Sequence, residues 1–194
     1  QYISRSGFVD LNRNNLLDVI GVSPTPTISL GETGSFDEFG TYPTSVIRNG
    51  NEIWAYYGGW TRCESVPFNV AIGVAASQDQ GASFRRLGNG PVLSYSVDEP
   101  FILSGPKIRR FNDRWYLFYI AGERWLPNNG KPEPVYRIRM ATSFDGINWT
   151  KANVDLIERK LGPDECQASP DVFFANGQFH MYFCYRYGID YRNS

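Results

Sequence analysis

The sequence predicts an all-β fold built from repeated modules of four short antiparallel strands. Helical periodicity is absent along the 194 residues, whereas short runs rich in Val, Ile, Phe, Tyr and Trp recur between Gly, Asn, Asp and Pro. One layout occurs three times: an acidic pair, a proline, an apolar strand and a turn. The prolines are Pro43, Pro106 and Pro170, spaced by 63 and 64 positions. A nearly constant period of this size predicts an array or ring of β-modules.

The first module contains four strand signals in a row. Its first two strands flank Asn49-Gly50, a dipeptide that favours a tight hairpin turn because such turns need positive φ angles. A loop over 58–69 leads to the third strand, and a turn over 78–82 leads to the fourth. The predicted strands are Thr44–Arg48, Glu52–Tyr57, Val70–Ser77 and Ser83–Leu87. Four antiparallel strands in succession are typical of one β-propeller blade.

The second module repeats this order, and the third contains only the first hairpin. Asn112-Asp113 and Asn176-Gly177 are the predicted hairpin turns, and a long loop is predicted over Gly122–Pro134. His180, the single histidine, is expected to pack within the last strand. The predicted strands are Lys107–Phe111, Arg114–Ile120, Tyr136–Ser143 and Trp149–Asn153, followed by Asp171–Ala175 and Phe179–Tyr185.

The N-terminal region matches the outer part of a blade. Ser4–Asp10 aligns with the third strands of both later modules. The sequence therefore predicts a partial propeller with an outer half-blade at 1–34, blades at 35–97 and 98–162, and an inner half-blade at 163–194. Two completions stay open: a longer chain that forms a five-bladed ring, or a homodimer whose chains complete each other's half-blades in a six-bladed ring.

Two turns between third and fourth strands carry a further repeat. Ser77–Phe84 fits the pattern Ser-x-Asp-x-Gly-x-Ser/Thr-aromatic, and Ser143–Trp149 is a shortened version of it. The Asp side chain of such a turn can accept hydrogen bonds from turn amides, and the Gly supplies a special dihedral angle. These turns resemble the Asp-box turns of sialidase-type propellers, which implies a structural role.

Composition excludes several classes of partner. The net charge of −1 gives no electrostatic case for binding nucleic acid, and no apolar run is long enough to span a membrane. The three cysteines form neither a disulfide framework nor a zinc pattern, and no cofactor or metal motif is present. We expect a cytoplasmic location, although secretion stays open because the natural N-terminus is not established.

The acidic pairs are the main candidates for chemistry. They are Asp37-Glu38, Asp98-Glu99 and Asp164-Glu165, each placed a few residues before one of the repeated prolines. The first strand of a blade lies nearest the propeller axis, so equivalent residues before it are expected to converge on one funnel. Carboxylates in a shared cavity shift one another's pKa values, which can provide an acid and a base for glycoside hydrolysis. The repeat aligns Asp37 with Asp164 and Glu38 with Glu165. Because strand alternation separates neighbours, we expect at most one acid of each pair to face the funnel.

The acid-then-proline strands in units of about 60 residues resemble the invertase, arabinanase and levansucrase superfamily of propeller glycoside hydrolases. Asp164-Glu165-Cys166 with Ser169-Pro170-Asp171 is similar to the Glu-Cys-Pro-Asp element of invertases, although three residues separate Cys166 from Pro170. Val97–Phe101 is similar to the Asp-Pro element that positions sugar hydroxyls, with an inserted Glu. The resemblance implies Glu165 as the general acid, with Asp98 and Asp37 as the other carboxylates. It also places a nucleophile or base on a first blade that would precede Gln1.

Loops after the second strands are predicted to return to the same rim and to supply sugar contacts. Aromatic faces stack on sugar rings, and Arg donates to hydroxyls or anionic groups. The leading prediction is a glycoside hydrolase-like protein with a carbohydrate ligand. The alternatives are a glycoside phosphorylase, in which rim arginines bind phosphate, and a non-catalytic carbohydrate-binding or assembly module. The candidate sugar contacts are Trp60, Arg62, Arg124, Trp125, Arg186 and Tyr187.

Overall fold

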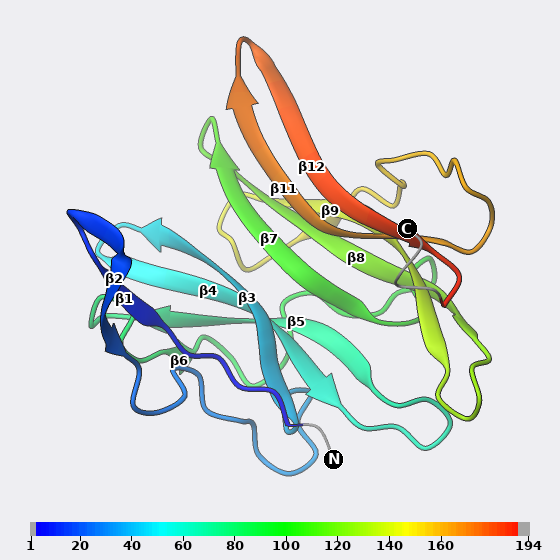
Figure 1. Cartoon of the computed structure of the whole chain (residues 1–194), viewed down its shortest axis with the longest axis horizontal. Coiled ribbons are helices and arrows are strands. Elements are labelled where there is room, and N and C mark those ends of the chain that lie inside the picture. The colour runs from blue at the N-terminus through cyan, green and yellow to red at the C-terminus, as the bar shows by residue number, and fades with distance from the viewer. Residues whose placement is uncertain (1–2, 190–194) are drawn as a thin grey trace.

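The computed structural model describes residues 3–189, and this part of the protein contains strands and no helix. Two sheets have four antiparallel strands each, and two further hairpins pair only within themselves. Figure 1 shows the sheets following one another along the sequence like adjacent blades. The prediction of an all-β fold made of four-stranded blades and partial blades is therefore confirmed.

The first four-stranded sheet has the order β3-β4-β5-β6. Its strands are β3 (Gly40–Asn49), β4 (Glu52–Thr61), β5 (Asn69–Ser77) and β6 (Arg85–Arg86). The hairpin closes at the Asn49–Glu52 pair, and Gly50 takes a φ of 59° in the turn. A side chain is strained at such an angle, so Gly is the favoured residue there. The sheet begins four residues before Thr44, the predicted start, because pairing continues across a bulge between Thr41 and Thr44.

The second sheet repeats this order as β10-β9-β8-β7. Its strands are β7 (Leu103–Phe111), β8 (Arg114–Leu126), β9 (Glu133–Ser143) and β10 (Thr150–Lys151). The loop predicted over Gly122–Pro134 is shorter than expected, because β8 continues to Leu126 and β9 begins at Glu133. Hydrogen bonding along this extended ladder satisfies backbone groups that a loop would have left to solvent.

The remaining strands form two hairpins. These are β1 (Val9–Asn12) with β2 (Asn15–Val22), and β11 (Glu165–Ala175) with β12 (Gln178–Tyr187). Both hairpins expose large apolar side chains, of which Leu17 at 93% and Tyr182 at 71% are the most exposed in each. In β12, His180 stacks on Phe173 with 5.3 Å between ring centroids, which is the packing role predicted for it. The domain boundaries at residues 34, 97 and 162 stay predictions.

The three strands that follow the acidic pairs lie side by side. β7 contacts β3 on one side and β11 on the other. The Ile108 amide donates to the Ser45 hydroxyl of β3 (3.2 Å), and the Arg109 side chain donates to the Val172 carbonyl of β11 (2.8 Å). Each of these strands also has a bulge just before or around its repeated proline. The repeat therefore places equivalent strands next to one another, as the propeller prediction requires.

The main core fills the space between the two four-stranded sheets. Tyr56 and Ile72 of one sheet and Leu117 and Tyr119 of the other are almost fully buried in it. The Tyr56 hydroxyl donates to the Gly146 carbonyl (2.8 Å), in the turn before β10. A buried hydroxyl requires such a partner, so this bond fixes the turn of one sheet against the β4 strand of its neighbour.

Candidate functional site

Asp37 is buried at 1% exposure, in the segment that leads into β3. Its Oδ2 accepts hydrogen bonds from the Tyr57 hydroxyl (2.8 Å) and from Arg86 Nε (2.8 Å), and its Oδ1 accepts from the Ser35 hydroxyl (3.0 Å). Burial and the Asp37 charge raise the pKa of Tyr57, so the phenol remains a donor. The carboxylate therefore ties the segment before the first strand to β4 and to the outermost strand, β6.

Glu99 has the same kind of partners in the second blade. Its exposure is 0%, and its Oε1 accepts a hydrogen bond of 2.8 Å from the Tyr119 hydroxyl. Lys151 Nζ of the outermost strand lies 2.5 Å from Glu99 Oε2, and Arg139 Nη1 lies 3.4 Å from Oε1. Burial and the nearby carboxylate raise the pKa of Tyr119. The contacts of Asp37 with a tyrosine hydroxyl and with a basic side chain of the outermost strand are thus repeated in the second blade.

The hairpin register explains this repetition. Asp37 and Glu99 each lie twelve residues before the last residue of their first strand, Asn49 or Phe111. The corresponding position before Ala175 in the third repeat is Pro163. Tyr57 and Tyr119 each lie five residues into their second strand, where β12 has Phe183. The third repeat therefore lacks both the acid and the hydroxyl that would bind it.

This register corrects the predicted alignment of the acids. The structural counterpart of Asp37 is Glu99, and Asp164 and Glu165 lie one and two residues beyond the equivalent position. Asp37 and Glu99 both bind side chains of later strands in their own blades. The convergence of the acids on one funnel stays a prediction. In each blade a basic side chain neutralises the buried carboxylate, and these contacts anchor the segment before the first strand.

Glu165 is a buried carboxylate of a different kind. It is the first residue of β11 and is 3% exposed. Its Oε2 accepts from the backbone amides of Lys160 and Leu161, both at 2.7 Å, and its Oε1 accepts from Gln167 Nε2 at 2.7 Å. Burial raises the pKa of Glu165, but these hydrogen bonds and the charge of Arg137 outweigh it and lower the pKa below its usual value.

Two buried polar side chains accompany Glu165. Gln167 is 0% exposed and Arg137 is 2% exposed, and both donate to the carbonyl of Ile157, Gln167 at 3.4 Å. Arg137 also faces Asp155, with 3.6 Å between Nε and Oδ2. Arg137 Nη1 and Gln167 Oε1 are buried and have no hydrogen-bond partner in the structure. The sequence did not single out either residue, because neither belongs to an acidic pair or a rim loop.

The other members of the acidic pairs lie at the surface or at turns. Glu38 accepts from the Gly34 amide (2.9 Å). Asp98 is exposed and lies 3.3 Å from Asn153 Nδ2. Asp164 forms an ion pair with Arg124, which also donates to the Pro163 carbonyl. Each pair thus has one buried acid, namely Asp37, Glu99 or Glu165.

The predicted aromatic contacts belong to strand ends and not to loops. Trp60 lies in β4 and Trp125 in β8, because both strands extend further than the sequence indicated. Phe68, in the loop between β4 and β5, lies between them, with centroid distances of 4.5 Å to Trp60 and 5.6 Å to Trp125. We call these three half-buried rings the aromatic row. It crosses from one blade to the next beside the ends of β4 and β8.

The other predicted contacts differ in their surroundings. Arg62 lies over the Phe39 ring at 3.9 Å. Arg186 is buried in β12 and donates to the Pro134 carbonyl (3.0 Å). Tyr187 is paired with Glu165 in the β11–β12 register and is half-exposed. Glu165 therefore has both a predicted sugar contact and a buried polar cluster next to it.

A charged cluster on the first strands was not predicted from the sequence. Asp171 of β11 pairs with Arg109 and with Lys107 (3.2 Å), both on β7. The sequence does place Lys107 and Asp171 at equivalent positions of the repeat, because each directly follows a repeated proline. Their pairing needed the knowledge that β7 and β11 are neighbours.

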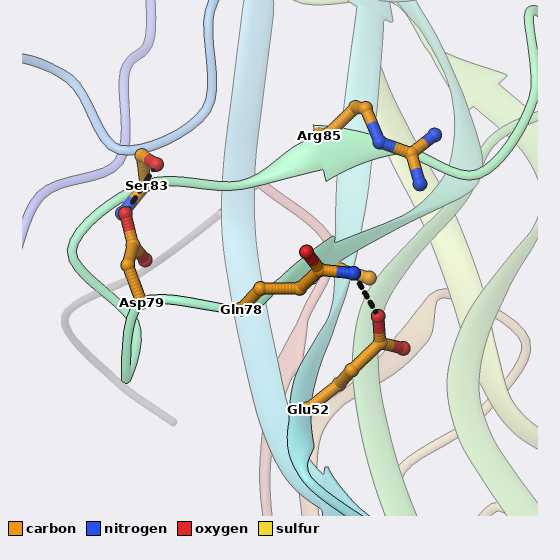
Figure 2. Close-up of a pocket in the computed structure, with 6 residues that line it drawn as sticks. Glu52, Gln78, Asp79, Ser83 and Arg85 are labelled. Atoms are coloured by element: carbon orange, nitrogen blue, oxygen red, sulfur yellow. Dashed lines mark hydrogen bonds between the residues drawn. The ribbon is translucent and has the colours of Figure 1, made fainter.

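Three cavities that do not include Glu165 in their lining border the first blade. A groove of about 570 Å³ separates the N-terminal segment from the first blade, and a cavity of about 400 Å³ borders Asp37 and Arg86. Figure 2 shows a smaller one of about 250 Å³, where Gln78 bonds to Glu52 and Asp79 to Ser83. Its polar groups are already hydrogen-bonded, and it lies at the opposite end of β4 from Trp60, so we do not consider it a functional site.

Neither a metal centre nor a spanning helix is found in the part of the protein that the structure describes. Residues 3–189 contain no group of three or more His, Cys, Asp and Glu side chains arranged to hold a metal ion. Within the same range, no helix is long and apolar enough to cross a membrane. Cys63, Cys166 and Cys184 are all unbridged thiols.

Comparison with known proteins first identified relatives in Mycobacterium tuberculosis. No family model matches the sequence. "Uncharacterized protein MT1551" from strain CDC 1551 / Oshkosh and "Uncharacterized protein Rv1502" from strain ATCC 25618 / H37Rv are each 31% identical to it over 174 residues. The match covers 90% of this chain and 57% of each relative. The protein described here therefore spans little more than half the length of these relatives.

Solved structures with a similar fold are propeller glycoside hydrolases. The Bombyx mori GH32 β-fructofuranosidase BmSUC1 has a TM-score of 0.63 at 22% identity, over 84% of this chain and 33% of its own. The sucrose-6-phosphate hydrolase from Lactobacillus gasseri has a TM-score of 0.60 at 17% identity, and the match covers 85% of this chain and 30% of the hydrolase. A thermostable family-43 glycoside hydrolase has a TM-score of 0.52 at 15% identity, and the match covers 79% of this chain and 43% of that enzyme. At these identities the likeness establishes the fold, and it confirms the resemblance to propeller glycoside hydrolases.

Proposed function

We propose that the protein is a glycoside hydrolase-like propeller that binds a carbohydrate beside the start of β11, with Glu165 as the carboxylate that takes part in its chemistry. The fold of its structural neighbours supports a carbohydrate-acting propeller. Glycoside hydrolysis requires a pair of carboxyl groups on either side of the scissile bond. In this proposal Glu165 supplies one of them.

The observation that carries the proposal is the contrast between Glu165 and the other two buried acids. Asp37 and Glu99 each bind a tyrosine hydroxyl and a basic side chain of their own blade, which accounts for their burial. Glu165 lies outside this repeated arrangement. It is surrounded instead by Gln167 and Arg137, whose buried polar atoms are not all bonded. A buried polar atom without a hydrogen-bond partner calls for an explanation, and a role in binding or catalysis is one of them.

The aromatic row supports a carbohydrate ligand. Trp60, Phe68 and Trp125 are half-buried rings, and Arg124, next to Trp125, pairs with Asp164, the neighbour of Glu165. This ion pair links a chain neighbour of the row to a chain neighbour of the carboxylate. Aromatic rings suit the apolar face of a sugar, and a carboxylate suits its hydroxyls.

The test is hydrolysis of a panel of aryl glycosides and reducing-sugar release from oligosaccharides. Glu165→Gln should lower turnover by about 100-fold or more, the range for loss of a group that transfers or accepts a proton. Glu158→Gln is the matched control, because Glu158 is exposed on the preceding loop. Equal turnover of Glu165→Gln and the control would refute the assignment. Turnover that depends on inorganic phosphate would instead indicate a glycoside phosphorylase.

A second candidate is a carbohydrate-binding propeller without catalysis. It is favoured by the donors around Glu165, which leave its pKa below the usual value, whereas hydrolysis also needs a protonated carboxyl group. In that case glycans should bind with no turnover. Glu165→Gln should leave the affinity unchanged, whereas Trp125→Ala should weaken it by up to about tenfold. Calorimetric titration with the same oligosaccharides separates this candidate from the hydrolase.

The completion of the half-blades is part of the same proposal. The exposed apolar side chains of β1–β2 and β11–β12 favour burial against further blades, supplied by a longer chain or by a second copy. Light scattering of the purified protein distinguishes completion by a second copy from completion by a longer chain. A dimeric mass favours the two-chain ring, and a folded monomer excludes it.

A further inference from the structure

We propose that Gln167 is a positioning residue that holds Glu165 as an ionised carboxylate, so that Glu165 acts as a base, nucleophile or charge-stabilising group and not as the proton donor. The catalytic part of this inference rests on the proposed function. The positioning part rests on the structure alone. The resemblance to invertases implies the opposite role, because it assigns Glu165 as the general acid.

The hydrogen bonds to the Glu165 oxygens all come from N–H donors. Its two oxygens receive three hydrogen bonds of 2.7 Å, two from backbone amides and one from Gln167 Nε2. A backbone N–H group cannot accept a proton. A protonated Glu165 would have to give up at least one of these bonds or direct its hydroxyl elsewhere. Bonds that are made only to the charged form stabilise that form.

Gln167 is held in the orientation that donates to Glu165. Its Nε2 bonds to two acceptors at once, Glu165 Oε1 at 2.7 Å and the Ile157 carbonyl at 3.4 Å. A rotated amide would turn its oxygen toward the Ile157 carbonyl, which can only accept a hydrogen bond whatever the ionisation of Glu165. The Ile157 carbonyl is in turn bound by Arg137. Gln167 thus connects the carboxylate to a fixed point on the loop before β11.

The charges around the cluster also favour ionised Glu165. Arg137 from β9 is 2% exposed and its positive charge lowers the pKa of Glu165. Asp155 forms ion pairs with both Arg137 and Arg139, and Asp164 forms one with Arg124 of β8. The elements packed against Glu165 carry further ionisable side chains, among them Glu123, Glu133, Tyr136, Glu158, Arg159, Lys160, Cys166, Arg186 and Tyr187.

This assignment changes what the rest of the site must provide. In a two-carboxylate mechanism one group donates a proton to the leaving oxygen while the other attacks or activates water. An ionised Glu165 can fill only the second role. The proton donor must then be a different carboxyl group with a raised pKa, supplied by another blade.

The inference is tested by NMR titration of the protein labelled with ¹³C at the glutamate carboxyl carbon. The Glu165 signal is identified by its loss in Glu165→Gln. We expect its midpoint to lie below about 4.3, the ordinary value for Glu. Gln167→Met, which keeps the side-chain length but removes the amide, should raise the midpoint by about one to two pH units, because a hydrogen bond to a charged group is worth about 1.5–3 kcal/mol.

The matched control is Gln178→Leu, since Gln178 is exposed at the start of β12 and should leave the midpoint unchanged. A wild-type midpoint at or above the ordinary value would overturn the ionised-carboxylate assignment without any variant. If Gln167→Met does not fold, Gln167→Asn withdraws the amide by one carbon and should give a smaller rise. An unchanged midpoint in a folded variant would overturn the role of Gln167. The titration needs no substrate, so its failure is distinct from the absence of glycosidase activity.

Discussion

The hydroxyl of Tyr57 donates a hydrogen bond of 2.8 Å to the carboxylate of Asp37, and Tyr119 makes the same bond to Glu99 in the next blade. Each acid also pairs with a basic side chain of the outermost strand, Arg86 or Lys151. This repeated arrangement joins the first segment, the second strand and the fourth strand of a blade. It accounts for the burial of Asp37 and Glu99, one acid from each of two acidic pairs.

Removal of the Asp37 charge should destabilise the first blade. Asp37→Asn leaves Arg86 without its anionic partner, and we expect a loss of about 2–4 kcal/mol in the free energy of unfolding. Tyr57→Phe removes one bond and should cost about 1–2 kcal/mol. Urea denaturation of both single variants and the double variant measures the coupling. Additive losses would contradict the proposed contact, since neighbouring residues in one network do not act independently.

Gly146 should resist substitution because of its backbone and its neighbours. Its φ is 78°, and an added Cβ would lie 2.7 Å from the Tyr56 hydroxyl oxygen and 3.0 Å from the Trp54 ring. Gly146→Ala should therefore lower the free energy of unfolding by about 2–4 kcal/mol. Gly88→Ala is the control, since a Cβ at that position meets no atom within 4 Å. Similar thermal midpoints for the two variants would show that the turn before β10 does not depend on this close packing.

The Asp79 turn should contribute stability that depends on pH. Hydrogen bonds from the Ser83 hydroxyl and amide, and from Ser77, lower the pKa of Asp79 to about 2. Because the folded pKa is below the unfolded value of about 3.9, the ionised form stabilises the folded state above about pH 4. This stability is lost as the pH falls toward 2. The difference in melting temperature between wild type and Asp79→Asn should narrow over that range.

The control for this pH dependence is Asp113→Asn, because the Asp113 side chain is 97% exposed in the β7–β8 turn. We expect only a small change in its melting temperature at neutral pH. A difference between wild type and Asp79→Asn that stays constant from pH 5 to pH 2 would argue against ionisation of Asp79 as the source of the stability.

The aromatic row should contribute to glycan binding under the proposed function. Trp125→Ala or Phe68→Ala should weaken binding of hexasaccharides of xylose, arabinose, mannose, glucose or fructose, measured by tryptophan fluorescence. The expected loss is up to about tenfold, since an aromatic contact is worth about 0.5–1.5 kcal/mol. Phe144→Ala is the control, because Phe144 is 81% exposed on a distant turn. Unchanged affinity in both variants would restrict the row to a packing role.

The local order of strands and turns could be predicted from the sequence because it depends on neighbouring residues. Asn112-Asp113 and Asn176-Gly177 adopt the positive φ angles that their residue types favour, and both hairpins form as expected. Strand ends were less predictable. Trp60 and Trp125 extend β4 and β8 because the neighbouring strands continue to pair with them, and such pairing is invisible in a local pattern.

The candidate site depended more on tertiary structure. The sequence identified the three acidic pairs, and burial selected one acid from each. It could not distinguish Glu165 from Asp37 and Glu99, because that distinction comes from partners 20 to 52 positions away, such as Tyr57, Arg86 and Lys151. Gln167 and Arg137 carry no recognisable motif. They stand out only in the structure, because both are buried beside the Glu165 charge, where a polar atom without a partner raises the free energy of the folded state.

The sequence by itself thus determined that this protein is made of β-propeller blades, since alternating apolar strands and Asn/Gly turns repeat with a constant period. Only the tertiary structure showed that Glu165 has different hydrogen-bond partners from the other two buried acids, Asp37 and Glu99. The physical reason is that a carboxylate's role is set by the donors and charges around it. Those groups reach Glu165 from β9, from β11 itself and from the loop before β11.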